Sequence, residues 1–235
     1  MSSPELPENI KEIKDREVFH FNCHPGVKCF TDCCRQLELA LSPYDVIHLR
    51  RQLGITSREF LDQYALVEWQ EGDVFPRVYL GMVDDGHASC PFVSGKGCAV
   101  YEGRPGACRT YPLGRAAFQQ PDSSLGSFHV VLKEDHCLGF AEADEQTIAR
   151  WTQGQGLQAY NQMNDAMMAI LHNPEVTKGF VPSPEQRGLF IATLYDIDAF
   201  RATGKVENVQ QLDDENLLLA AITWLRRQLF GFFEL

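Results

Sequence analysis

The chain has 235 residues, of which 44% are hydrophobic and 23% are charged, and its formal net charge is −11. A chain of this length can bury a core of its own, so it does not need the disulfide scaffold on which small secreted domains depend. The acidic balance, without any basic run, argues against binding to nucleic acid, because that binding relies on Lys and Arg neutralising phosphates.

The first 18 residues are polar and interrupted by proline, and we expect residues 1–18 to form a loose N-terminal arm. They contain no apolar stretch of the kind that secretory signals carry. The apolar stretch near the other end, Leu217 to Leu225, is far shorter than the ~20 residues that a bilayer span requires. We therefore expect a cytoplasmic protein without a membrane segment, in a compartment where thiols stay reduced.

The first cysteine loop, residues 19–36, carries four thiols within twelve residues, spaced Cys-x5-Cys-x3-Cys-Cys. Such density indicates metal ligands, disulfides or redox centres, and a reducing compartment favours metal over disulfides. The last two, Cys33 and Cys34, are adjacent. Neighbouring side chains in extended backbone point to opposite sides, so this pair would reach two metal atoms more readily than one.

Two helices are predicted after this loop from their capping signals. Ser42 can cap a helix that has Pro43 at its first position and Gly54 just past its end. Thr56 and Glu59 have the spacing of a capping box for a second helix. Short strands are expected between residues 66 and 83, with 74–80 as the best candidate.

The second cysteine loop runs from Ser89 to about Gly114 and contains Cys90, Cys98 and Cys108. Its glycines and prolines permit tight backbone, so the loop can wrap a metal centre closely. A strand is predicted at residues 127–133, leading to the last cysteine, Cys137.

Two arginines in the second loop are candidates for binding the cofactor. Arg104 and Arg109 flank Cys108, and their charge would offset that of several thiolates and lower the thiol pKa values. The alternative is that both form surface salt bridges in an acidic protein.

The sequence changes character after Cys137. No further cysteine follows, and helices are predicted at residues 143–152 continuing into 156–172, at 185–202 and at 213–230. We therefore predict an α+β fold in which an irregular cysteine-rich metal-binding domain, residues 19–140, has short strands and helices. A helical C-terminal region, residues 141–235, would pack on it.

Thiolates are soft ligands that select zinc or iron–sulfur clusters, and four complete one site. Eight cysteines allow two such sites, or one site with spare thiols. The histidines near them, His24, His87 and His136, are candidate substitutes, but the thiols suffice without them. The aromatic C-terminal stretch, Leu225 to Leu235, is expected to fold back onto the helices, or alternatively to bind a protein partner.

Three stretches together resemble the YkgJ-type cysteine-cluster family over about residues 19–140. They are the cysteine pattern of the first loop followed by Arg35, the Cys-Pro-Phe at 90–92, and the Tyr-x-x-Arg-Pro-x-x-Cys-Arg-x-Tyr-Pro run at 101–112. Members are described as zinc- or iron-chelating or as iron–sulfur-cluster-containing proteins. Many open with Cys-x2-Cys-x2–4-Cys-Cys, and this chain departs from that form by its wider first spacing.

The resemblance implies metal binding, and we take an iron–sulfur cluster as the preferred cofactor and zinc as the alternative. The predicted metal ligands are Cys23, Cys29, Cys33, Cys34, Cys90, Cys98, Cys108 and Cys137. The predicted role is redox, metal-handling or structural. One relative, a flagellin lysine methylase, suggests an enzyme instead, either a protein-lysine methyltransferase-like or a redox catalyst. A third hypothesis is an interaction protein whose metal only folds a recognition surface.

Overall fold

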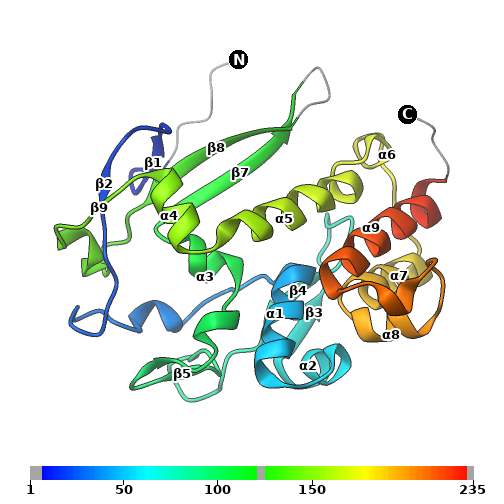
Figure 1. Cartoon of the computed structure of the whole chain (residues 1–235), viewed down its shortest axis with the longest axis horizontal. Coiled ribbons are helices and arrows are strands. Elements are labelled where there is room, and N and C mark those ends of the chain that lie inside the picture. The colour runs from blue at the N-terminus through cyan, green and yellow to red at the C-terminus, as the bar shows by residue number, and fades with distance from the viewer. Residues whose placement is uncertain (1–6, 121–124, 232–235) are drawn as a thin grey trace.

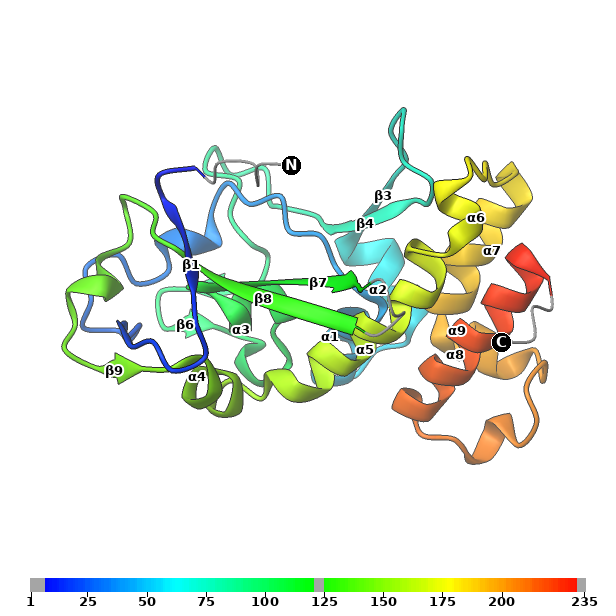
Figure 2. The ribbon, with the colours of Figure 1, turned by 90° about the horizontal axis from the view of Figure 1, so that it is seen from above.

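The computed structural model describes residues 7–120 and 125–231, and it has the predicted α+β fold. Figure 1 shows α7, α8 and α9 grouped at one end and β2 and β9 at the other. The β7–β8 hairpin and α5 run between the two ends, and Figure 2 shows the same arrangement from above. The cysteine loops thus lie in the part of the molecule that has the short strands.

The two helices predicted from capping signals are confirmed as α1 (Pro43–Leu53) and α2 (Ser57–Tyr64). Ser42 accepts a hydrogen bond from the backbone of Asp45, whose carboxylate in turn accepts from Ser42. Gly54 ends α1 in the left-handed region, at φ 69°, a conformation that glycine adopts without steric cost.

Three strands form the main antiparallel sheet, in the order β1 (Ile10–Ile13), β8 (Leu125–Leu132) and β7 (Leu113–Gln119). The predicted strand at 127–133 is β8, whereas β7 was not predicted. Part of the expected N-terminal arm is therefore β1, which pairs with β8.

Three two-stranded ladders complete the strands. They are β2 (Phe19–His20) with β9 (Glu145–Gln146), β3 (Ala65–Glu68) with β4 (Arg77–Leu80), and β5 (Val93–Ser94) with β6 (Gly97–Cys98). Of the predicted strand 74–80, only the second half is β4. The second cysteine loop also contains α3 (Gly106–Thr110) and the 3-10 helix η2 (Tyr101–Gly103).

The C-terminal region is helical, with boundaries that differ from the predicted ones. Its helices are α4 (Ile148–Gly154), α5 (Leu157–Leu171), α6 (Pro174–Thr177), α7 (Pro184–Leu194), α8 (Ile197–Ala202), the 3-10 helix η4 (Val209–Gln211) and α9 (Asp214–Phe230). The helix predicted from residue 143 begins later, because 145–146 pair with β2 and Thr147 caps α4. The helix predicted at 185–202 is broken, because Asp196 starts a new helix by capping α8.

One continuous hydrophobic core joins the strand region to the helices. Polar contacts run across the same boundary: the Trp151 indole donates to the Thr110 carbonyl at 3.0 Å, and the Tyr160 hydroxyl donates to the Arg104 carbonyl at 3.2 Å. Helices α4 and α5 therefore hold the loop that contains Cys108 in place through these two hydrogen bonds.

The start of the aromatic C-terminal stretch is part of this packing. Leu225 and Leu229 are buried in α9, and the Phe230 ring meets Phe180 edge-on at 4.9 Å. Residues 232–235 lie outside the described part of the chain, so a protein partner for the tail stays a prediction.

An ion cluster around Asp214 ties three helices together. Its carboxylate binds Arg50 and Arg51 of α1, the latter at 3.0 Å, and Arg201 of α8 at 2.8 Å. The Asp214 side chain is only 12% exposed, so these partners replace the water that the charge has lost.

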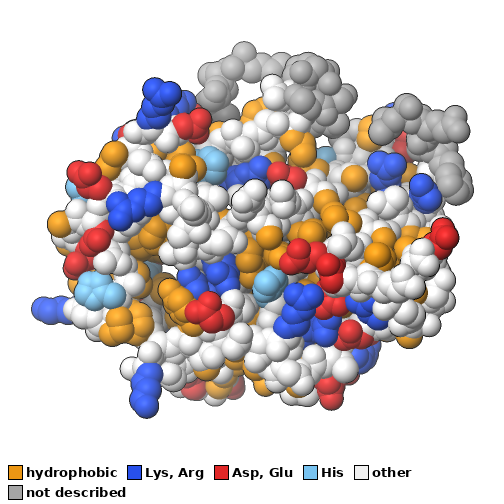
Figure 3. Space-filling model, in the orientation of Figure 1, with side chains coloured by type: hydrophobic (Ala, Val, Ile, Leu, Met, Phe, Trp, Pro, Cys, Tyr) orange, Lys and Arg blue, Asp and Glu red, His pale blue; other side chains and the backbone are white. Residues whose placement is uncertain are grey.

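None of the described helices is both long and apolar enough to cross a bilayer. On the face drawn in Figure 3, positive and negative side chains are interspersed, and no broad basic field covers it.

Candidate metal centre

The first cysteine loop folds as consecutive tight turns. Four backbone N–H groups each donate to the carbonyl three residues earlier, those of Val27, Phe30, Asp32 and Cys34, at 2.9 to 3.0 Å. The last turn is the 3-10 helix η1 (Asp32–Cys34), so the extended backbone assumed for Cys33 and Cys34 was wrong. Successive side chains of a 3-10 helix are rotated by about 120°, and the pair still leaves the backbone in two directions.

The second loop is attached directly to the adjacent cysteines. The Cys90 N–H donates to the Cys34 carbonyl at 2.8 Å, and the Gln36 N–H donates to the Ala88 carbonyl at 3.0 Å. Val93 donates to the Cys90 carbonyl at 3.1 Å and pairs with Cys98 across the β5–β6 ladder. Two cysteines of the second loop are thereby held close to Cys34.

Cys137 is brought back to the start of the first loop by η3 (Leu138–Ala141). The Leu138 N–H donates to the Cys29 Sγ at 3.2 Å, and the Asn22 N–H donates to the Gly139 carbonyl at 3.1 Å. Cys137 and Cys23 therefore lie beside the segments that hold Cys29.

The thiols lie near enough to affect one another's ionisation. Burial, and then the charges of Cys33, Cys29 and Cys137, raise the pKa of Cys23 to about 11. The charge of Arg104 acts in the opposite direction on the pKa of Cys23. Burial also raises the pKa of Cys137, with further contributions from Cys29 and Cys33.

The adjacent pair interacts with both loops. Hydrogen bonding from the Cys34 thiol lowers the pKa of Cys33 to about 7, and the same interaction raises the pKa of Cys34. The charges of Cys90 and Cys108 raise the pKa of Cys34 further.

The thiols of the second loop also interact. Burial raises the pKa of Cys90, and the charge of Cys98 adds to this. Desolvation by the surrounding chain, then the charges of Cys90 and Asp45, raise the pKa of Cys108 to about 12, although the residue is partly exposed at the surface. Thiols with raised pKa values are protonated at neutral pH, so metal must displace protons and binding should tighten as the pH rises.

The two arginines predicted to bind the cofactor make defined contacts within the protein. Arg104 lies 3.7 Å from the centre of the Tyr101 ring and donates to the Tyr101 carbonyl and to Gln155. Arg109 donates to the carbonyls of Arg104 and Gln155, both at 3.0 Å, and to that of Glu102. Both arginines thus fix the loop around Cys108, and their role toward a bound group stays a prediction.

The nearby histidines have other partners. The His24 Nδ1 accepts from the Gly26 N–H at 3.1 Å, and its Nε2 lies 3.4 Å from Glu142. His136 lies 3.7 Å from Glu134. The imidazole contacts of His24 and His136 are with protein groups, consistent with loop or supporting roles.

The donor set fits a thiophilic metal. All eight cysteines are free thiols, the soft donors that zinc and iron–sulfur clusters select. Within residues 7–120 and 125–231, no three His, Cys, Asp or Glu side chains converge on one ion.

Tyr111 is a neighbouring group that was not singled out from the sequence. Among the described residues its buried hydroxyl has no hydrogen-bond partner of good geometry. Burial, and then the adjacent Cys137 thiol, raise the pKa of Tyr111. A buried donor of this kind suits a thiolate sulfur, which accepts hydrogen bonds once its proton is lost. The sequence signal that could have identified Tyr111 is its position in the Tyr-x-x-Arg-Pro-x-x-Cys-Arg-x-Tyr-Pro run.

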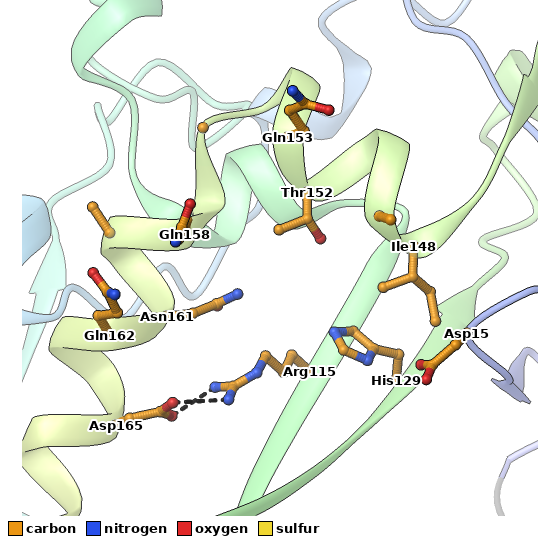
Figure 4. Close-up of a pocket in the computed structure, with 13 residues that line it drawn as sticks. Asp15, Arg115, His129, Ile148, Thr152, Gln153, Gln158, Asn161, Gln162 and Asp165 are labelled. Atoms are coloured by element: carbon orange, nitrogen blue, oxygen red, sulfur yellow. Dashed lines mark hydrogen bonds and ion pairs between the residues drawn. The ribbon is translucent and has the colours of Figure 1, made fainter.

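A large groove lies apart from the thiols, between the β7–β8 hairpin and α4 and α5 (Figure 4). Its volume is about 1070 Å³, and none of its lining residues is a cysteine. Arg115 and His129 project into it from the sheet, and Arg115 forms a two-pronged ion pair with Asp165 of α5 at 2.7 and 2.9 Å.

Comparison with known proteins identifies one family. Residues 22–125 match the model of the family described as "CxxCxxCC: putative zinc- or iron-chelating domain". The matched segment includes the seven cysteines from Cys23 to Cys108 and leaves Cys137 outside. No curated protein and no solved structure matches the chain.

Proposed function

We propose that the chain holds an iron–sulfur centre with the eight cysteines as its candidate ligands, since residues 22–125 match the model of the family of zinc- or iron-chelating domains, the YkgJ-type family. The domain binds metal; the identity of the metal and the ligands is our proposal. The observation that carries it is that hydrogen bonds bring the second loop and the Cys137 segment to the first loop: the Cys90 N–H donates to the Cys34 carbonyl, and the Leu138 N–H donates to the Cys29 sulfur.

The directions of two adjacent thiols favour an iron–sulfur centre over a single zinc ion. Four thiolates complete either a tetrahedral zinc site or an iron–sulfur cluster, so the argument depends on direction and not on number. Cys33 and Cys34 leave the backbone in different directions, as ligands of separate metal atoms would. Iron–sulfur clusters distribute their cysteine ligands over several iron atoms.

The surrounding residues would adjust the properties of such a centre. The Leu138 N–H already donates to the Cys29 sulfur, and the Tyr111 hydroxyl is available beside Cys137. Hydrogen bonds to the sulfurs are one means by which proteins set reduction potentials. When bound, the cluster would supply electron transfer or a structural cross-link.

Anaerobic purification followed by elemental analysis and a visible spectrum tests the proposal. Iron with acid-labile sulfide and broad visible absorption is the expected result. Zinc in a colourless sample would overturn the iron–sulfur assignment while keeping metal binding. A fully reduced sample without metal would overturn both.

Single cysteine substitutions test which thiols ligate. Cys34→Ser and Cys108→Ser are each expected to reduce the metal bound per chain, and full loading in both variants would contradict the proposed ligand set. His87→Ala is the matched control, because His87 is exposed and lies three residues before Cys90. It should retain full loading.

The enzyme alternative requires an open coordination position beside a substrate cleft. The groove of Figure 4 does not provide that cleft, because its lining residues include no cysteine. A catalytic role therefore stays a prediction from the resemblance alone.

A further inference from the structure

Helix α5 presents a stripe of polar side chains to the groove of Figure 4, beside the apolar stripe that it buries in the core. The polar stripe consists of Gln158, Asn161, Gln162 and Asp165. Positions three and four residues apart lie on one face of a helix, so these side chains share a single wall of the groove. That wall is rich in carboxamides, which both donate and accept hydrogen bonds.

The opposite wall is a face of the main sheet. Arg115 of β7 and His129 of β8 are cross-strand partners, and both project into the groove. His129 also pairs with Ile13 of β1, and Asp15 follows Ile13 two residues later. The sheet wall therefore presents a row of three polar groups, Arg115, His129 and Asp15, opposite the carboxamides.

The charges in the groove are largely balanced. Among the described lining residues Arg115 is the only Lys or Arg, and both of its terminal nitrogens bond the Asp165 carboxylate. Burial, and then the charge of Arg115, lower the pKa of His129, while the charge of Asp15 acts in the opposite direction. The imidazole is therefore uncharged at neutral pH. A ligand with phosphate groups would find no unpaired cation here.

Asp15 is the exception to this balance. It is exposed, and it has no ion-pair partner in the part of the chain that the structure describes. The end of the groove beside Asp15 therefore attracts a positive charge, whereas the Arg115–Asp165 end favours an uncharged polar group.

The remaining lining is small and aliphatic, and it includes Ile148, Ala149 and Ala159. No aromatic ring on which a sugar could stack is among the described lining residues. An extended peptide carries N–H and C=O groups on both sides of its backbone. Polar groups on two facing walls, with short apolar surfaces between them, match a peptide backbone with small side chains.

We propose that the groove binds an extended peptide segment with small, uncharged side chains and a cationic amino group beside Asp15. Arg115 is held by Asp165 through one N–H of each terminal nitrogen, so its Nε–H and outer N–H groups can bond a peptide carbonyl. Asn161 would bond the backbone from the helix wall. The peptide site does not require the metal centre, because no cysteine lines the groove.

NMR titration of the ¹⁵N-labelled full chain tests the site, with trialanine amide as the probe. The backbone signals of Arg115, His129 and Asn161 should shift and saturate. N-acetylated trialanine amide lacks the cation and should bind roughly two- to fivefold more weakly, the usual effect of one exposed ion pair. Asp15→Asn should remove the difference between the two peptides.

Asn161→Leu removes the carboxamide and should weaken binding of trialanine amide roughly tenfold, as expected for the loss of one or two hydrogen bonds. Asn164→Leu is the matched control, because it makes the same change on α5 at a position that does not line the groove. It should bind like wild type. The dispersion of the amide signals shows that each variant is folded.

Absence of saturable shifts with both peptides in wild type would overturn the proposal, as would equal weakening in the two leucine variants. Equal affinities of the two peptides in wild type would overturn the placement of the cation beside Asp15. Maltotriose and sodium phosphate are the comparison ligands. Saturation of the same signals by either of them, without saturation by the peptides, would assign the groove to a sugar or an anion instead.

Discussion

Gly139 allows the segment after Cys137 to lie close to the beginning of the first cysteine loop. A Cβ at this position would lie 2.7 Å from the Asn22 carbonyl oxygen and 2.8 Å from a ring carbon of Phe21. Phe21 is itself fixed by edge-on contacts with Tyr111, Phe140 and Trp151. Glycine is therefore required here by space.

Gly139→Ala should accordingly lower the free energy of unfolding by about 1–3 kcal/mol, the usual cost of overpacking. Urea denaturation of the metal-free protein measures it. Gly95→Ala is the matched control, because a Cβ there meets nothing within 4 Å. A loss at Gly139 no larger than at Gly95 would contradict the contact.

Asp214 makes stability depend on pH. Burial alone would raise its pKa, but the charges of Arg50 and Arg51 and the hydrogen bond from Arg201 outweigh it, and the pKa of Asp214 lies below the ordinary value of 3.8. A lowered pKa in the folded state stabilises the fold above the pKa of the unfolded chain. That contribution is lost as the pH falls through the folded-state value.

Asp214→Asn should therefore destabilise the protein by about 3 kcal/mol at neutral pH, since it removes the carboxylate that pairs with the largely buried Arg50, with Arg201 and with the more exposed Arg51. The difference from wild type should shrink below about pH 4, as Asp214 protonates in wild type. Urea denaturation of wild type and Asp214→Asn at several pH values measures this difference in the free energy of unfolding. Asp62→Asn removes an exposed pair with Arg58, and a comparable loss there would contradict the special place of Asp214.

The residues of the candidate site were predictable to different degrees. The cysteines were found because their density is itself the signal. Asp45 and Tyr111 were not, because Asp45 resembles an ordinary helix-capping acid in the sequence. Its hydrogen bond to Gly106, 61 residues later, exists only in the folded chain.

At the level of elements, sequence prediction succeeded where the signals are local. The caps Ser42, Thr56 and Gly54 act within one turn, and α1 and α2 were located by them. Strand β7 was missed because Gly114, Ala116 and Ala117 are weak strand formers. It is a strand because β8 pairs with it along its full length. The pairing with β8, and not the composition of β7 itself, makes this segment a strand.

Helix α7 contains a glycine that its surroundings do not require. Gly188 is exposed in the middle of Pro184–Leu194, and a Cβ there would meet nothing within 4 Å. Gly188→Ala should raise the free energy of unfolding by about 0.5–1 kcal/mol, because alanine loses less backbone entropy in a helix. Thermal denaturation measures it, and unchanged or lower stability would contradict the expectation.

For the molecule as a whole, the α+β class and its helical C-terminal part were predicted and are confirmed. The sequence predicted that the helices pack on the cysteine-rich part, but not the hydrogen bonds by which Trp151 and Tyr160 hold the loop around Cys108, because nothing in the sequence indicates these partners. The cysteine-rich part and the helices share one continuous hydrophobic core, and these two hydrogen bonds add to it.

Metal removal should affect the molecule unevenly. Ligand binding stabilises the segments that form its site, so chelation should speed amide hydrogen exchange at residues 22–36, 88–110 and 137–146. Amides of α7, α8 and α9 should keep their protection, because their helices pack on one another away from the thiols. Hydrogen exchange with mass spectrometry measures this. A uniform rise across the chain would show instead that the metal supports one cooperative unit.

The pairing of β2 with β9 sets an order of events during synthesis. Residues 19–20 find their partners only at 145–146, and more than one hundred residues separate Cys23 from Cys137. At about 5–20 residues per second, the ribosome needs on the order of ten seconds to cover that distance. The first four thiols are thus made well before Cys137, so under the proposed ligand set the site can be completed only after translation has passed Cys137.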